Sequence, residues 1–193
     1  MTAHAEREPT KVRLRSRTIH TTPWAQVRED DIRLGSGHTD RFLVVSRSNF
    51  VVIVGETPEG RVVMVDQFRY AAGRWSLELP QGGVEPGEDV CEAALRELRE
   101  ETGWEADSPV VLAERVYEAA DWATQYGSFV SVRLTRPGPP ERERGEQGMT
   151  TRLVGPHEVP ALVGSGAVTD AVTLAGLCLR DFAGSLHTVK EER

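Results

Sequence analysis

The residues best suited to chemistry are three glutamates in one acidic segment, residues 90–102. On a helix, which turns about 100° per residue, Glu97, Glu100 and Glu101 fall within an arc of about 100°, beside an apolar arc. Such close like charges repel and raise each other's pKa, and a divalent cation would neutralise them. Carboxylate oxygens suit Mg²⁺ or Mn²⁺, which keep waters and bridge to substrate phosphates. The segment is therefore predicted to bind metal and phosphate.

A solvated charged helix face is the alternative, because Glu and Arg at i,i+4 support solubility without forming any site. The spacing of the surrounding residues argues against it. Average residue usage makes a chance match at all of the fixed positions on the order of a few in a billion per starting position. These positions are Gly82, Glu88, Arg96, Glu97, Glu100, Glu101 and Gly103.

This spacing resembles the Nudix box, and the chain resembles the Nudix family. The mixture of strands and few helices points to an α+β fold with a mixed β-sheet. The resemblance implies a Nudix α/β/α sandwich with an N-terminal β-strand extension. It also implies a pyrophosphohydrolase in which metal ions bridge the helix carboxylates and a pyrophosphate. The departure from the box is Trp104, where the family usually has an aliphatic residue. Because tryptophan is also apolar, this departure concerns packing more than chemistry.

Roles follow from the resemblance position by position. Glu97 and Glu101 would be the principal metal ligands, and Glu100 a further ligand or the residue that orients the attacking water. Arg96 resembles the arginine that buttresses these glutamates by ion pairing. Gly82 would let its backbone approach the metal.

The ends of the box and the general base complete the implied site. Glu88 would help to fix the loop before the helix, and Gly103 is the expected helix stop. In the sugar-nucleotide branch of the family the base often lies on a late loop, here the stretch that contains Glu141, Glu143 and Glu146. We choose Glu146 because it precedes the next expected strand by a few residues. An ordinary solvated loop glutamate is the alternative.

Three segments outside the box resemble ADP-ribose pyrophosphatases and their nucleoside-diphosphate-sugar relatives, namely residues 66–70, 74–80 and 164–174. The predicted reaction is therefore metal-dependent hydrolysis of the pyrophosphate bond of a nucleoside diphosphate sugar, ADP-ribose-like. In that branch the N-terminal strands help to form a dimer, and partner residues contribute to the nucleobase pocket. A homodimer is thus expected.

The same branch suggests substrate contacts. Arg69 would contact phosphate, for which a guanidinium fork is well suited. Glu78 would lie at the rim of the substrate or metal site, or be a strand-edge charge. Trp24 and Phe42 are candidates for stacking on the base, although an aromatic residue near a strand is more often core or interface.

Two alternatives for function remain open. ADP-ribose hydrolases typically have a proline about fifteen residues past the box. This chain has Ala119 and Ala120 there, which is a departure from the ADP-ribose pattern and leaves other substrates open. Residues 80–83, Pro-Gln-Gly-Gly, resemble the start of the box in RNA 5′-pyrophosphohydrolases and dinucleoside polyphosphate hydrolases. A non-catalytic nucleotide-sugar binding module is the third possibility, but such modules tend to lose box glutamates and this chain keeps them all.

Composition suits one globular domain with a small extension. We expect tails at 1–10 and 187–193, an N-terminal β extension at 11–48, placed at the dimer interface, and a Nudix domain at 49–186. A net charge of −7 without a basic cluster disfavours nucleic acid and membrane surfaces as partners. Neither an apolar run of about 20 residues nor a secretory signal is visible, so a cytoplasmic location is expected.

The expected elements follow from periodicity and end signals. The principal helix is 90–102, with a capping box from Asp89 and Glu92 at its start. The other expected helices are 156–163 and 167–183. The expected strands are 27–34, 41–45, 49–54, 61–68, 111–117 and 128–134, with a polar loop at 136–148 followed by a short strand.

Overall fold

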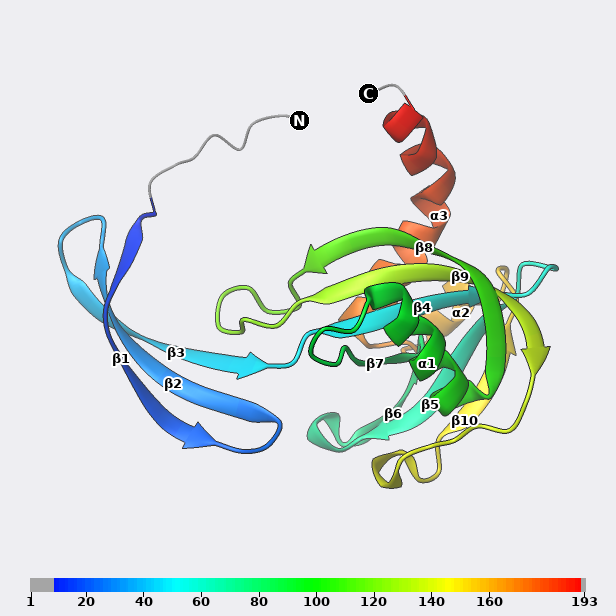
Figure 1. The fold of residues 1–193 in the computed structure, drawn as a ribbon, viewed down its shortest axis with the longest axis horizontal. Coiled ribbons are helices and arrows are strands. Elements are labelled where there is room, and N and C mark those ends of the chain that lie inside the picture. The colour runs from blue at the N-terminus through cyan, green and yellow to red at the C-terminus, as the bar shows by residue number, and fades with distance from the viewer. Residues whose placement is uncertain (1–8, 192–193) are drawn as a thin grey trace. The chain divides into compact units, whose positions relative to one another are not determined.

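The computed structural model describes residues 9–191, with the backbone alone from 183 onward. These residues form two compact units (Figure 1). The first contains the chain up to Ser48 together with 119–125, and the second contains Asn49–Glu118 and the chain from Tyr126 onward. The box and the expected general base both belong to the second unit.

The first unit is an antiparallel sheet of three strands in sequence order, within the residues described. Its strands are β1 (Lys11–Thr21), β2 (Ala25–Leu34) and β3 (Thr39–Arg47). The strands expected at 27–34 and 41–45 are confirmed by β2 and β3. The sequence did not single out β1, in which every residue is exposed, so no buried apolar face marks it as a strand.

The second unit is built on a mixed sheet of seven strands within residues 49–191. Its main order is β10-β5-β4-β9-β8, while β6 pairs with β5 and β7 with β4. The pair β4 and β9 is parallel and the other pairs are antiparallel. The strands are β4 (Phe50–Glu56), β5 (Val62–Arg69), β6 (Arg74–Glu78), β7 (Gln81–Gly83), β8 (Trp104–Val116), β9 (Gly127–Pro137) and β10 (Thr150–Val154).

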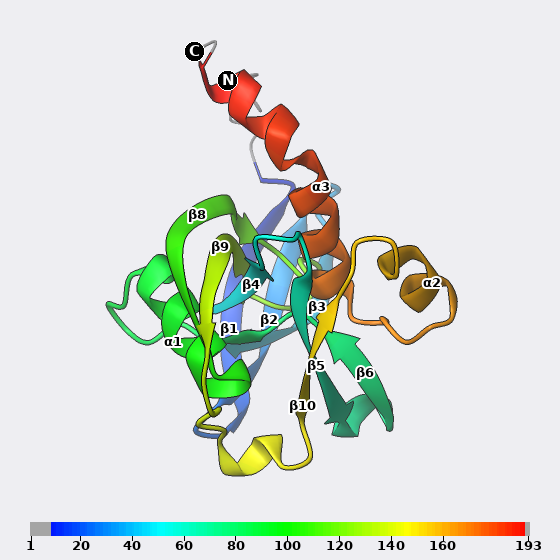
Figure 2. The same ribbon diagram turned by 90° about the vertical axis from the view of Figure 1, so that its right-hand side faces the viewer.

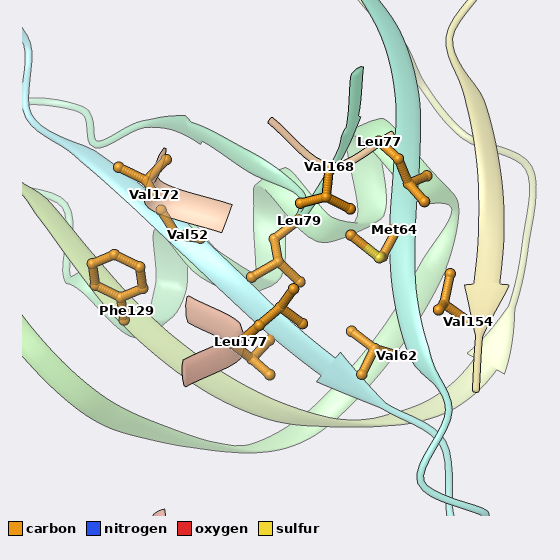
Figure 3. Packing of buried hydrophobic residues seen from close by; sticks show 11 residues of the cluster. Val52, Val62, Met64, Leu77, Leu79, Phe129, Val154, Val168, Val172 and Leu177 are labelled. Carbon is orange, nitrogen blue, oxygen red and sulfur yellow. The ribbon is translucent and has the colours of Figure 1, made fainter. Parts of the chain in front are cut away.

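Helices cover both faces of this sheet (Figure 2). Side chains alternate along a strand, so Val51 and Ile53 of β4 face the cluster that contains Leu98 of helix α1. Val52 and Val54 face the opposite cluster, where Leu177 of helix α3 packs (Figure 3). This arrangement confirms the predicted α+β sandwich. The helices are α1 (Val90–Thr102), α2 (Val159–Gly164) and α3 (Ala171–Glu191), with short 3₁₀ turns η1 (Tyr70–Ala72) and η2 (Arg144–Glu146).

Helix α1 has the predicted limits, because strong local signals mark both ends. The Asp89 carboxylate accepts hydrogen bonds from the backbone N–H groups of Cys91, at 2.8 Å, and Glu92, at 3.3 Å. Gly103 ends the helix with φ of 76° and donates its N–H to the Arg99 carbonyl. The prediction of a full capping box is wrong, since the Glu92 side chain makes no return bond to Asp89 among the hydrogen bonds of residues 9–191.

Later boundaries differ from those expected. Strand β9 continues to Pro137, into the segment expected as a loop, because it stays paired with β8 there. Helix α3 begins at Ala171 and continues through Glu191, so the tail predicted from residue 187 is helical as far as Glu191. No proline or glycine follows Gly184 to stop it. Among residues 9–191, no helix combines the length and apolarity that a membrane span requires.

Strand β8 is irregular along its pairing with β9. The register shifts at several places, including the step from Asp107 to Val110, which spans Pro109. Ser108 and Arg115 each have φ of 54°, a left-handed conformation that is uncommon for residues other than glycine. These are the features of β-bulges, which bend and twist the strand on the outer side of the sheet.

Candidate active site

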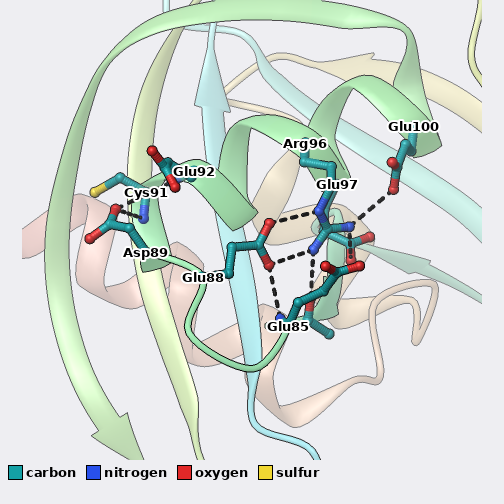
Figure 4. Close-up of polar contacts among 9 residues, drawn as sticks. Glu85, Glu88, Asp89, Cys91, Glu92, Arg96, Glu97 and Glu100 are labelled. Carbon is teal, nitrogen blue, oxygen red and sulfur yellow. Dashed lines mark hydrogen bonds and ion pairs between the residues drawn. The ribbon is translucent and has the colours of Figure 1, made fainter.

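Arg96 is the centre of the polar network on α1 (Figure 4). Its Nε and Nη2 donate to the two carboxylate oxygens of Glu88 at 2.8 and 2.9 Å. Its Nη1 donates to Glu97 at 2.8 Å and to Glu100 at 3.1 Å. Nη2 also donates to the Gly83 carbonyl at 2.8 Å. One guanidinium therefore joins the loop before the helix to two of the box carboxylates, and the buttressing role of Arg96 stays a prediction.

The hydrogen bonds between Arg96 and Glu88 stabilise the charged forms of both side chains. Hydrogen bonds to Glu88 raise the pKa of Arg96 above its usual range, despite the opposing effect of burial. The same hydrogen bonds hold the pKa of Glu88 below its ordinary value. Glu88 also accepts the backbone N–H of Glu85 at 2.9 Å, which fixes the turn between β7 and α1. Glu88 therefore bonds both to the turn before the helix and to Arg96 within the helix.

Gly82 lies directly against the carboxylate of Glu97. A Cβ at position 82 would overlap the carboxylate carbon and both of its oxygens. The pKa of Glu97 is raised, first because the group is buried and then because of the charges of Glu100 and Glu146, while Arg96 acts in the opposite direction. The strand β7 thus needs a glycine here, because its backbone forms the wall beside a confined carboxylate.

Glu101 is the most deeply buried of the box carboxylates, with 3% of its surface exposed. One of its oxygens accepts the backbone N–H of Gln81 at 3.2 Å. Burial raises its pKa well above the ordinary value, and the charges of Glu146 and Glu97 raise it further. A buried carboxylate without a full counter-charge lies at the end of the helix that carries the box.

The carboxylates fit a divalent cation chemically but are not gathered around one point. Among the residues described, no three His, Cys, Asp or Glu side chains form a ready metal-binding cluster. The reason is visible in the contacts, since Arg96 holds Glu97 and Glu100 while Gln81 holds Glu101. The raised pKa values of Glu97 and Glu101 mark them as the groups that a cation would stabilise most.

Glu146 lies close enough to act electrostatically on both Glu97 and Glu101, whose pKa values its charge raises. It is the last residue of η2, a turn that ends shortly before β10. Its carboxylate accepts the backbone N–H of Glu143 at 2.9 Å, which closes a capping box on this turn. The structure therefore brings Glu146 near the box, while its role as base stays a prediction.

Arg69 on β5 and the buried Glu78 on β6 form an ion pair in which the arginine is partly exposed. The Arg69 Nε donates to both Glu78 oxygens at 3.1 Å. Glu78, which is 1% exposed, also accepts from the side chains of Gln67 at 3.3 Å and Gln81 at 2.9 Å. Burial lowers the pKa of Arg69, but the contacts with Glu78 outweigh it and leave that pKa raised. Glu78 is thus an anchor for three donors rather than an exposed strand-edge charge.

Gln81 joins this pair to the box, a role that the sequence analysis missed. Its side chain donates to Glu78 while its backbone N–H donates to Glu101. Its place next to Gly82 was the available signal. Trp24, in contrast, belongs to the first unit, where it is 77% exposed in the turn between β1 and β2. The proposed stacking role of Trp24 stays a prediction.

Comparison with known proteins identifies the class of this fold and site. Residues 45–169 match the family model of the NUDIX domain. The chain therefore belongs to the Nudix family and is a Nudix hydrolase. Residues 12–45 match a second model, the nucleoside diphosphate sugar hydrolase N-terminal domain. The two matches together span residues 12–169.

Curated relatives agree with this assignment. The chain is 30% identical to the ADP-ribose pyrophosphatase of Mycobacterium tuberculosis over 163 residues, which cover 84% of this chain and 79% of that protein. It is 39% identical over 77 residues to the ADP-ribose pyrophosphatase of Bacillus subtilis, covering 40% of this chain and 42% of that one. It is 40% identical over 78 residues to the methanol dehydrogenase activator of Bacillus methanolicus, covering 40% and 42%.

The two Bacillus matches thus span less than half of those relatives. Among solved structures, the crystal structure of an ADP compounds hydrolase superposes with a TM-score of 0.80 at 19% identity, over 94% of this chain and 98% of that one. This likeness shows a common fold.

Proposed function

We propose that the protein hydrolyses the pyrophosphate bond of a nucleoside diphosphate sugar, ADP-ribose-like, in a metal-dependent reaction. The observation that carries the proposal is the grouping of half-buried Glu97, buried Glu101 and Glu146, whose charges act on one another and which a divalent cation would neutralise. The matches to ADP-ribose pyrophosphatases and to the sugar hydrolase N-terminal domain support the substrate class.

The proposed cation is Mg²⁺ or Mn²⁺, the divalent ions that suit carboxylate oxygens and phosphate. Glu97 and Glu101 would hold it, with Glu100 as a further ligand and the backbone of Gly82 alongside. When bound, such an ion activates water and neutralises charge on the phosphates. When Glu97 and Glu100 turn from Arg96 to the ion, Arg96 would keep its bonds to Glu88 and Gly83. These bonds would keep the helix anchored.

Glu146 is proposed to take the proton from the attacking water. The water oxygen forms a bond to phosphorus, the anhydride P–O bond breaks, and the proton passes to a Glu146 oxygen. One oxygen of this carboxylate, Oε2, accepts the N–H of Glu143 at 2.9 Å, which leaves the other oxygen to take the proton. A well-placed base contributes about 10²–10⁴-fold in rate.

Arg69 and Trp24 are proposed to contact the substrate. Arg69 is held by Glu78 yet keeps 42% of its side chain exposed, which leaves an edge of the guanidinium for a phosphate oxygen. Trp24 would stack on the nucleobase within a homodimer formed by the N-terminal strands. The matched N-terminal domain supports this assignment of the first unit. We also propose a cytoplasmic location.

A substrate panel tests the proposal. We would measure phosphate-coupled hydrolysis of ADP-ribose, GDP-mannose, diadenosine tetraphosphate and 5′-triphosphate RNA, each with and without Mg²⁺, beside the Glu101→Gln variant. Metal-dependent cleavage of the sugar nucleotides that the variant loses is the expected result. Preference for the polyphosphate or RNA would instead favour the alternative suggested by residues 80–83, a dinucleoside polyphosphate or RNA 5′-pyrophosphohydrolase. No turnover on any substrate would favour a binding module.

A further inference from the structure

The C-terminal end of α1 is bonded to the segment that leads to Glu146. The last carbonyls of a helix have no donors within the helix and need partners from outside. The Glu141 N–H donates to the Glu100 carbonyl at 2.8 Å. The Arg142 Nε donates to the Glu101 carbonyl at 2.9 Å. Two neighbouring residues of the loop therefore satisfy the carbonyls of two box glutamates.

Arg142 also binds the far end of the same loop. Its Nη1 donates to the Met149 carbonyl at 2.6 Å and its Nη2 to the Thr151 hydroxyl at 2.9 Å. All three guanidinium nitrogens are thus engaged, each with a different acceptor. A planar guanidinium presents these donors in a fixed fork, which a lysine ammonium cannot reproduce. One half-buried side chain closes the base of the loop that spans residues 142–149.

The course of this segment along the helix end is also specified by Gly103. A Cβ at position 103 would overlap the backbone of Gly138 and Pro139. Its φ of 76° is likewise a conformation that favours glycine. The close approach of the loop to the end of α1 therefore depends on the residue that terminates the helix.

Little else fixes the loop. Residues 143–145, 147 and 148 are exposed, and burial resumes at Met149. Glu146 is half-buried, and its position depends on the bonds of Arg142 to both ends of the loop, on its own capping box and on the Met149 N–H, which donates to the Glu146 carbonyl at 3.1 Å. A closed base restricts the loop to fewer conformations, so a side chain at its tip is more closely confined.

We propose that Arg142 is a positioning residue, which holds Glu146 close to Glu97 and Glu101. The inference rests on the proposed function, in which Glu146 accepts the proton. Arg142 does not itself contact substrate. Its effect on the reaction is indirect, through the placement of the base relative to the helix whose carbonyl it caps.

The test compares Arg142→Gln and Arg142→Lys with Arg144→Gln, a matched control on an exposed arginine of the same loop. We would measure kcat and KM with ADP-ribose as the substrate. We would also measure the amide hydrogen exchange of residues 143–149. Both Arg142 variants are expected to lose about 100-fold in kcat, as a misplacement of about 1 Å can cause, with KM changed by less than about threefold. Amide exchange is expected to rise about tenfold or more, and the control to change neither quantity.

Three outcomes would overturn the inference, and they are distinguishable. If Glu146→Gln lowers kcat but Arg142→Gln does not, Glu146 remains assigned as the general base, and the proposal that Arg142 positions it fails. If Glu146→Gln keeps full kcat, the assignment of the base fails and the role of Arg142 with it. If wild-type protein cleaves no substrate, exchange decides alone, because unchanged exchange in both Arg142 variants would show that the side chain does not hold the loop.

Discussion

The backbone of Gly82 lies against the carboxylate of Glu97 so closely that no side chain fits between them. The obstructing atoms are the end of a flexible side chain, so Gly82→Ala should displace Glu97 rather than unfold the sheet. We expect nearly unchanged thermal stability and a loss of activity of about 100-fold, because displacements of about 1 Å cost that much. Gly83→Ala is the matched control, since a Cβ there meets nothing within 4 Å. Equal activity in the two variants would contradict the prediction.

The pair of Arg69 and Glu78 should behave as a structural unit. Arg69→Met leaves Glu78 buried with two neutral amide donors, and removing one partner of a buried pair costs about 3–5 kcal/mol. Because Arg69 is 42% exposed, solvent screening reduces the expected loss to about 2 kcal/mol in the free energy of unfolding. The double variant with Glu78→Gln should recover much of it. Urea denaturation measures both, and a double variant no more stable than Arg69→Met would contradict the argument.

Glu101 should make the metal-free protein less stable as the pH rises. Its folded pKa is raised above the ordinary 4.5 by burial, and by the charges of Glu146 and Glu97. The folded protein therefore holds a proton on Glu101 that the unfolded chain releases. The contribution of this proton to the free energy of unfolding is full below the pKa of the unfolded state, and it is lost as the pH rises through the raised pKa of the folded state. Glu101→Gln keeps an oxygen for the Gln81 N–H and removes the charge.

We therefore expect Glu101→Gln to melt at a higher temperature than the wild type at pH 8 in the presence of a chelator. Added Mg²⁺ should raise the melting temperature of the wild type, increasingly at higher pH, and leave the variant unchanged. Melting curves at several pH values, with chelator or Mg²⁺, measure both effects. A variant that melts below the wild type at pH 8 would show that the buried charge is compensated within the protein.

Replacing Arg96 by lysine should weaken both the turn before α1 and the site. The ammonium cannot maintain the paired contact with Glu88 together with the bonds to Gly83 and Glu97. We expect a loss of about 2 kcal/mol in the free energy of unfolding, from the partly buried charged hydrogen bonds. Arg99→Lys, on the exposed side of the same helix, is the control. Denaturant unfolding that is equal for both variants would be inconsistent with Arg96 as the centre of the network.

Local signals explain which parts of the fold were predictable. Asp89 and Gly103 bracket α1 within a few residues of sequence, so the limits of that helix follow from the chain itself. The parallel pairing of β4 with β9 has no local signal, because it brings together residues such as Val52 and Phe129 that are far apart in sequence. A mixed sheet was expected from the mixture of strands and few helices along the chain, but that pattern does not say which strands pair.

The same distinction applies to the site. The contacts of Arg96 with Glu97 and Glu100 lie within one helix, so the spacing of the box is enough to suggest them. The contact of Arg142 with the Glu101 carbonyl joins residues 41 positions apart and leaves no pattern in the sequence. The full burial of Glu78 likewise depends on donors from other strands, so its residue type and position did not decide between an anchor and a rim residue.

The irregular strand β8 has a consequence for the protein in concentrated solution. It is the outer strand of the main sheet, where a regular strand would offer its free N–H and C=O groups to another molecule. Its bulges and the left-handed residues Ser108 and Arg115 break that row of groups, and Pro109 has no N–H to offer. This edge of the sheet therefore resists extension by a strand of a second chain.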